Sequence, residues 1–214
     1  VWIAPARGGT PRQISDVAGY YSHPIFTPDG KSVLAVRSDN NARLHTSMEF
    51  GQHVREAALV SMETDGGPVK VIATGTFGGK PHFSADANLV YVRQAAGLSS
   101  IDLTSGEIKP AVNVQGPNWY FAESLAQVDD SRLSPDGKWV LAIIAQQAHV
   151  VSAPGPGQVV DLLNPGREHR RITDVGADFI EWADDGKTVT WSVGSTFYRR
   201  SLADIKLNAA NSPS

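Results

Sequence analysis

The sequence contains no cysteine in its 214 residues, so disulfides, thiolate metal sites and cysteine catalysis are excluded. No apolar stretch approaches the 18 or so residues that a transmembrane helix needs, so no membrane span is predicted. Charged residues make up only 19% of the chain, the net charge is −3, and no basic stripe is present, which argues against a nucleic-acid partner. By contrast, 20 glycines and 13 prolines indicate a chain rich in turns.

The local motifs of several enzyme classes are also missing. There is no Gly-x-Ser-x-Gly elbow, no His-Glu-x-x-His or His-x-His pair, no P-loop and no dinucleotide fingerprint. A triad assembled from distant residues stays open, although nothing in the sequence motivates a pair such as Ser124 with His149. We therefore expect no catalytic residue, no metal site and no cofactor in this chain.

A short phrase recurs four times, at residues 26–35, 83–91, 133–142 and 182–191. Its aspartates, Asp29, Asp86, Asp136 and Asp185, stand 57, 50 and 49 residues apart. A period of roughly 40 to 50 residues is typical of β-propeller blades. The sequence therefore predicts an all-β propeller of about four blades, each an antiparallel four-stranded sheet.

Each copy of the phrase reads as two strands joined by a tight turn. Aspartate bonds to its own backbone two residues on, and glycine accepts the positive φ at which such a turn ends. Gly30, Gly137 and Gly186 supply this glycine, whereas Asp86 is followed by alanine and its turn is expected to be the loosest. Because the repeat itself accounts for the aspartates, we interpret them as structural turn residues and not as metal or catalytic groups.

The spacing of the phrases divides a single domain, residues 1–207, into blades. The expected parts are the outer strands of one blade (1–16), three blades (22–74, 80–114 and 129–174), the inner strands of a last blade (178–202) and a disordered tail (208–214). The apolar runs after the turns, such as 32–36 and 139–144, predict inner strands that are covered on both faces. The charged residues 167–171 are expected on an exposed edge strand, where charges discourage further pairing.

Four phrases leave two arrangements open. The N-terminal outer strands could complete the last blade and give a small closed ring, or the chain could form a partial ring. Exposed blade edges in a partial ring would favour a homodimer. The start at Val1 without methionine, inside an outer-strand phrase, favours the partial ring and a piece of a longer protein.

Two segments interrupt the repeat, and function on repeat scaffolds usually lies at such interruptions. The first segment, near residues 40–56, holds Arg43, His45, His53 and Arg55. A separation of eight residues between the histidines is not a recognised metal-ligand spacing. A binding loop, an interface or a solvated loop is therefore favoured over a metal site.

The second interruption, residues 116–124, contains three consecutive aromatic residues, Trp119, Tyr120 and Phe121, followed by Glu123. Aromatic side chains beside a carboxylate can form a binding platform. The simpler interpretation is a plug of aromatic rings that covers one end of the propeller core. Both interpretations stay open.

The phrase Phe/Leu-Ser/Thr-Pro-Asp-Gly-Lys followed by an apolar strand resembles the repeats of TolB-like (WD-like) β-propellers, and so does the outer-strand phrase at residues 2–14. More narrowly, residues 116–124 and 191–199 are similar to segments of the TolB-like propeller that precedes the catalytic barrel of large bacterial amidohydrolase-type proteins. In that family the barrel carries a metal-binding His-x-His pair. This chain has no such pair, and its four phrases are fewer than the six blades of the TolB ring.

The resemblance implies a non-catalytic domain that gates substrate access or docks onto the catalytic domain of a larger, metal-dependent bacterial hydrolase. Two alternatives stay open, a standalone TolB-like protein-binding module of the cell envelope and the propeller of a prolyl-oligopeptidase-type serine peptidase. The partner implied in each case is another protein or the chain's own missing catalytic domain. A periplasmic location is implied by the resemblance alone.

Overall fold

The computed structural model describes residues 1–42, 44, 53–117 and 125–208. The chain forms two compact units: the first comprises Val1–Phe83, Ala87–Gln94 and Ser100–Lys109, and the second comprises Ser84–Asp86, Ala95–Ser99 and Pro110–Ser214. Apart from helical residues at 40–42 and 44 and the 3-10 turn η1 (Leu202–Asp204), the regular structure described is β-strand. Strand β8 (Gly97–Asp102) contributes residues to both units.

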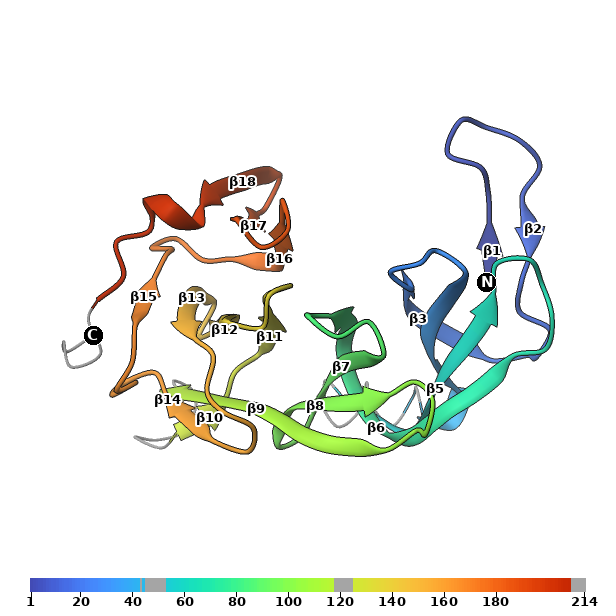
Figure 1. The fold of residues 1–214 in the computed structure, drawn as a ribbon, viewed down its shortest axis with the longest axis horizontal. Coiled ribbons are helices and arrows are strands. Elements are labelled where there is room, and N and C mark those ends of the chain that lie inside the picture. Colours follow the sequence, from blue (N-terminus) through green and yellow to red (C-terminus); the bar gives the residue numbers. More distant parts are fainter. Residues whose placement is uncertain (43, 45–52, 118–124, 209–214) are drawn as a thin grey trace. The chain divides into compact units, whose positions relative to one another are not determined.

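The first unit is built from strands that follow one another as antiparallel neighbours (Figure 1). They are β3 (Tyr20–Phe26), β4 (Ser32–Ser38), β5 (His53–Glu63), β6 (Lys70–Phe83) and β7 (Leu89–Gln94). Two very short strands, β1 (Trp2–Ile3) and β2 (Arg12–Gln13), pair only with each other. Antiparallel pairing of consecutive strands is the meander expected of propeller blades.

The second unit contains a four-stranded antiparallel sheet of β11 (Asp130–Leu133), β12 (Trp139–Ile144), β13 (Gln147–Ser152) and β15 (His169–Arg171). A three-stranded sheet follows, made of β16 (Asp178–Ala183), β17 (Thr188–Val193) and β18 (Thr196–Ser201). Strand β9 (Ile108–Pro117) pairs with β10 (Leu125–Gln127) and, in parallel, with β14 (Val159–Asp161). The edge strand predicted around residues 167–171 is confirmed, because β15 ends its sheet.

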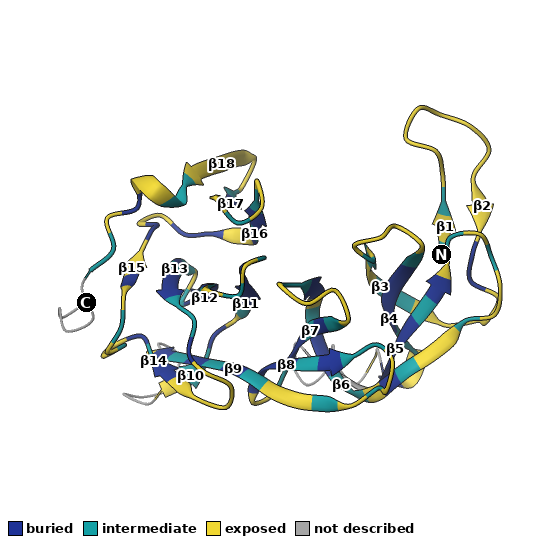
Figure 2. Ribbon diagram, in the orientation of Figure 1, coloured by how far each residue is buried: buried dark blue, intermediate teal, exposed yellow. Residues whose placement is uncertain are grey.

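The predicted burial of the inner strands on both faces is confirmed. In β4, Leu34 and Val36 pack into one apolar cluster with Phe77, while Val33 and Ala35 pack into another on the opposite face. Strand β12 is buried in the same way from Val140 to Ile144. Figure 2 shows these strands as buried, whereas β18 is exposed along most of its length.

The turn of the first phrase is held by the side chains of Thr27 and Asp29. Thr27 Oγ1 lies 2.7 Å from Asp29 Oδ1, the Lys31 N–H donates to that carboxylate at 3.1 Å, and the Ser32 N–H donates to Thr27 Oγ1 at 3.0 Å. These hydrogen bonds, that from Thr27 foremost, lower the pKa of Asp29. Gly30 closes the turn at φ 69°.

The third phrase repeats this arrangement. The equivalent distances are 2.6 Å from Ser134 Oγ to Asp136 Oδ1, 3.0 Å from Lys138 N to Asp136 Oδ1 and 2.9 Å from Trp139 N to Ser134 Oγ, with Gly137 at φ 72°. Two turns about a hundred residues apart in sequence are therefore built by the same bonds, which is the structural form of the repeat.

The other two phrases differ from this pattern. In the fourth, Gly186 donates its N–H to Ala183 O at 3.1 Å, but the bonded carboxylate is that of Asp184, which accepts from Thr188 and Arg199. Asp185 lies beside it at φ 53°. Asp86, from the copy without glycine, is exposed between β6 and β7.

The predicted all-β class, with antiparallel blades, is confirmed. Within the described ranges no helix is long and apolar enough to cross a membrane. The predicted tail falls mostly on residues 209–214, outside the description, while Asn208 is ordered and pairs with His169.

Candidate functional site

Both segments proposed from the sequence fall largely outside the described residues. These are Arg43 and His45 in the first segment and Trp119, Tyr120, Phe121 and Glu123 in the second. His53 and Arg55 belong to β5, but the described part of the structure does not include their side chains. Their roles stay predictions.

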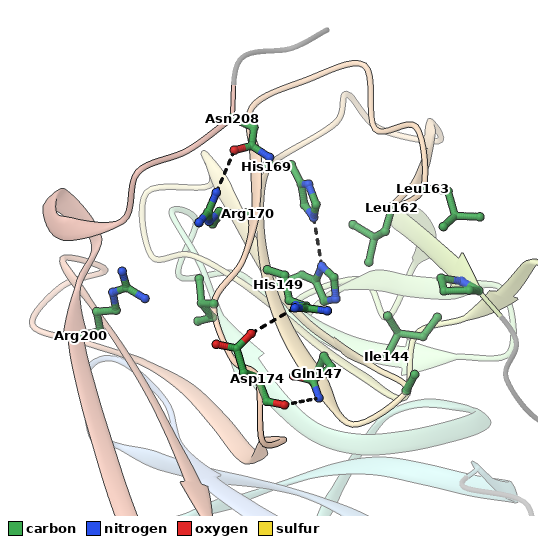
Figure 3. Close-up of a pocket in the computed structure, with 14 residues that line it drawn as sticks. Ile144, Gln147, His149, Leu162, Leu163, His169, Arg170, Asp174, Arg200 and Asn208 are labelled. Carbon is green, nitrogen blue, oxygen red and sulfur yellow. Dashed lines mark hydrogen bonds and ion pairs between the residues drawn. The ribbon is translucent and has the colours of Figure 1, made fainter. Parts of the chain in front are cut away.

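The described chain shows a different site, a cavity of about 630 Å³ within the second unit (Figure 3). This volume is in the range of small-ligand pockets. Strands β13 and β15 supply its polar groups, above all His149, His169, Arg170 and Arg171. Leu162 and Leu163, which follow β14, form part of an apolar wall, and Asn208 and Arg200 complete the rim.

The hairpin between β12 and β13 positions one end of the cavity. Its two connecting residues, Ala145 and Gln146, both have positive φ, 48° and 62°. This is the backbone of a type I′ turn, whose twist matches that of paired strands. The turn brings Ile144 and Gln147 opposite one another, and both line the cavity.

The register of β13 and β15 decides which side chains meet. His149 pairs with Arg171, and Val151 pairs with His169. Residues that are directly opposite, or two apart along a strand, project from the same face, so His149, His169 and Arg171 share one face. Arg170, paired with Val150, lies on the other face.

The two histidines are joined by a hydrogen bond of 3.0 Å between His149 Nδ1 and His169 Nε2. The ring centroids are 5.3 Å apart and the ring planes differ by only 13°. With the bonded nitrogens between the centroids, this separation means that the rings lie end to end, as Figure 3 shows. One ring must donate its N–H and the other must accept it, so the pair is stable when both are neutral.

Burial lowers the pKa of His149 to about 3, and the nearby His169 and Arg171 reinforce the shift. The pKa of His169 is lowered too, by burial first and then by Arg170. Both rings are therefore neutral at physiological pH. A histidine suited to general acid–base catalysis has a pKa near the working pH, which is not the case for His149.

The arginines of the cavity differ in how their charge is balanced. Arg171 donates to Asp174 at 3.1 Å, and both side chains are well exposed. Arg170 donates to the neutral amide oxygen of Asn208 at 3.1 Å, and no carboxylate contacts it among the described residues. The Arg200 side chain has no hydrogen bond or ion pair with any described residue. The described residues thus supply no counter-ion for these two positive charges of the cavity.

Asn208 fixes the C-terminal end of the described chain to β15. Its N–H donates to the His169 carbonyl at 2.9 Å, and its carbonyl accepts from the His169 N–H at 3.4 Å. Because its side chain also accepts a hydrogen bond from Arg170, the same residue pairs with the strand edge and orients the Arg170 guanidinium.

No group of three or more His, Cys, Asp or Glu side chains in the described ranges is arranged to hold a metal ion. The facing nitrogens of His149 and His169 point at each other and not at a common third position, which does not fit a tetrahedral zinc site. What the cavity offers chemically is positive charge beside an apolar wall. It is therefore a site for binding an anionic group.

Sequence reasoning missed this cavity. The sequence predicts only an edge strand around residues 167–171 and a tail that begins at Asn208, and neither expectation indicates a cavity. His149 and His169 are twenty residues apart in sequence, and strand β14, which pairs with β9, lies between their two strands along the chain. No local motif indicates that the two histidines are in contact. Only the strand register brings them together.

Comparison with known proteins identifies the fold. No protein-family model matches the sequence, and no curated protein matches it. Among solved structures, TolB from Acinetobacter baumannii matches 100% of the chain and 48% of its own length, with a TM-score of 0.58 at 17% identity. A TolB candidate from Agrobacterium tumefaciens matches 96% of the chain and 70% of its own, with a TM-score of 0.52 at 15% identity.

A candidate 6-phosphogluconolactonase from Bacteroides fragilis also matches, over 97% of the chain and 61% of its own length, with a TM-score of 0.55 at 19% identity. The chain thus spans about half the length of the Acinetobacter protein and less than two thirds of the Bacteroides protein. At these identities the likeness establishes a TolB-like β-propeller fold, and it carries no activity with it.

Proposed function

We propose that this chain is a non-catalytic β-propeller domain that binds another protein. The observation that carries the proposal is the cavity of the second unit, where Arg170 and Arg200 have no carboxylate partner among the described residues and Leu162 and Leu163 form part of an apolar wall. Uncompensated arginines at an exposed rim favour recognition of a negatively charged surface. The neutral, mutually bonded histidines between them support binding over proton transfer.

The partner in this proposal is the catalytic domain of a bacterial amidohydrolase-type enzyme. This choice is supported by the similarity of residues 116–124 and 191–199 to the propeller that precedes the barrel in such proteins. The domain would gate substrate access or dock the barrel. A periplasmic location belongs to the same proposal and rests on the same resemblance.

A standalone TolB-like binding module of the cell envelope is the second candidate. It is favoured by the match to two TolB-type structures over 96% to 100% of this chain. Such a module would need no catalytic domain and would bind a separate protein.

Activity assays on the isolated chain test the proposal that it is non-catalytic. Ester, amide and lactam substrates are assayed with and without Zn²⁺ and Mn²⁺, together with a phosphorylated sugar lactone because of the Bacteroides neighbour. We expect no turnover above the protein-free control. Metal-dependent turnover by this chain alone would overturn the proposal.

The coding sequence on both sides of these 214 codons separates the candidates. A downstream barrel with a His-x-His pair would support the amidohydrolase-associated domain, and a downstream Gly-x-Ser-x-Gly would move the chain to the serine peptidases. A stop codon directly after Ser214, with a signal peptide and further blades upstream, would support the standalone module.

A further inference from the structure

The edge of β15 next to the cavity has a backbone position open for pairing. The Ser152 N–H donates to Glu168 O at 2.9 Å and the Ile172 N–H donates to Ala148 O at 2.8 Å, so residues 168, 170 and 172 direct their backbone groups at β13. His169 and Arg171 therefore direct theirs away from the sheet. The backbone N–H and C=O of His169 bond to Asn208. The backbone N–H and C=O of Arg171 have no partner among the described residues. An unpaired edge of this kind is a template for an added strand.

The two faces of this edge have different chemistry. Arg170 and Arg200 lie on one side of the β15 backbone, and Leu162, Leu163 and Ile144 lie on the other (Figure 3). A strand added to the edge projects alternate side chains to the two faces. One set of its side chains would meet the arginines and the other set would meet the apolar wall.

Charge selects the ligand on the arginine side. Arg170 is held by a neutral amide and Arg200 is free within the described structure, while Arg171 is already balanced by Asp174. Asp174 is the one carboxylate among the described residues that line the cavity. An acidic side chain placed near Arg170 and Arg200 would gain charge-assisted hydrogen bonds without displacing an existing ion pair.

We propose that the β15 edge binds an extended segment of a partner protein in which acidic and apolar residues alternate, by adding it as a strand opposite Arg171. Backbone hydrogen bonds to Arg171 supply the pairing, and the two-sided cavity supplies the selectivity, as in other cases of strand addition. This inference rests on the proposed protein-binding function and names the chemistry of the partner segment.

The test is a titration of the ¹⁵N-labelled full chain with an acetylated, amidated hexapeptide of alternating Glu and Leu. We expect saturable binding and a shift of the Arg171 backbone amide. An alternating Lys and Leu peptide is expected to bind at least tenfold more weakly. No saturable binding at millimolar peptide, or equal binding of the two peptides, overturns the proposal.

Two further probes test the strand itself. The Glu–Leu peptide with alternate amides N-methylated cannot pair its backbone, and we expect it to lose binding. Glutarate and inorganic phosphate test for a simple anion site. If either one shifts the Arg171 amide as the peptide does and displaces the peptide completely, the cavity binds small anions and strand addition is wrong.

Matched variants test whether Arg170 and Arg200 bind the acidic side chains of the peptide. Arg170→Gln combined with Arg200→Gln is expected to weaken binding of the Glu–Leu peptide by about tenfold or more, since hydrogen bonds to charged groups are lost. Arg199→Gln is the control, because Arg199 precedes Arg200 on β18 but pairs with Asp184. An equal loss in both variants contradicts the assignment. Failure to bind peptide, in a chain without hydrolase activity, removes only this inference, whereas hydrolase turnover removes the proposed function itself.

Discussion

His149 Nδ1 lies 3.0 Å from His169 Nε2, and the two imidazoles lie end to end in nearly one plane. Because a single proton occupies the shared hydrogen bond, one ring is fixed as donor and the other as acceptor. A proton can be added to the pair only against its burial and against the charges of Arg170 and Arg171. Protonation of both rings would place two N–H groups face to face and break the contact.

This pair predicts that the protein loses stability as the pH falls below about 6.5. The folded-state pKa of His149 is lowered from 6.5 to about 3 and that of His169 is also lowered, so the unfolded chain binds protons first. The stability is fully present above the unfolded pKa and decreases as the pH falls towards the folded value. The slope is at most about 1.4 kcal/mol per pH unit for each histidine. Urea unfolding between about pH 7 and pH 4.5 measures it.

The double variant His149→Asn and His169→Gln is the matched test, because the two amides can preserve a hydrogen bond at the same positions but do not titrate. We expect a flatter pH profile than that of the original chain. A slope that survives in the double variant would show that other groups cause it. The aspartates with lowered pKa act in a separate window, below about pH 4.

The repeat allowed much of the fold to be predicted, because its information is local. Each phrase carries two apolar runs and the turn between them, so the pairs β3–β4, β11–β12 and β16–β17 follow from neighbouring residues. The parallel pairing of β14 with β9 was not predicted. Val159–Asp161 is a three-residue strand with no periodic signal, and its partner lies more than forty residues earlier.

The cavity could not be predicted for a related reason. The contact of His149 with His169 depends on the register of β13 and β15, and a shift of one residue would turn every side chain of β15 to the other face. The hydrogen bond that Arg170 donates to the Asn208 amide oxygen joins residues 38 positions apart. In contrast, the turn of Asp136 needed only its immediate neighbours.

Trp182→Phe is predicted to destabilise the protein more than Trp191→Phe. Both tryptophans are buried in one apolar cluster, but only Trp182 donates a buried hydrogen bond, from Nε1 to Arg132 O at 3.1 Å. Trp191 Nε1 makes no hydrogen bond with the described residues. The two changes remove similar volume, so the difference, about 0.5–1.5 kcal/mol in the free energy of unfolding, isolates the hydrogen bond from Trp182 to the Arg132 carbonyl. Urea denaturation measures both, and equal losses would contradict the prediction.

Asp136→Ala is predicted to lower the free energy of unfolding by about 0.5–1.5 kcal/mol, because Ser134 Oγ and the Lys138 N–H both lose their acceptor. Asp136→Asn keeps one oxygen and should lose less. Asp65→Ala is the control, since the Asp65 side chain is fully exposed and its contact with Arg12 is 3.6 Å long. Thermal unfolding at neutral pH ranks the three. If Asp136→Ala is as stable as Asp65→Ala, the carboxylate does not hold the turn.

Gly106→Ala is predicted to be much more destabilising than Gly30→Ala, although the two glycines have nearly the same backbone conformation, φ 73° and φ 69°. A Cβ at Gly106 would lie 2.3 Å from the backbone oxygen of Ile72, whereas a Cβ at Gly30 would have nothing within 4 Å. The positive φ costs about 1–2 kcal/mol at either position. At Gly106 the clash adds about 1–3 kcal/mol more, because a backbone carbonyl cannot rotate away as a side chain does. Chemical denaturation of both variants separates the two contributions. Equal losses in the free energy of unfolding would mean that the backbone around Ile72 shifts to remove the clash without loss of stability.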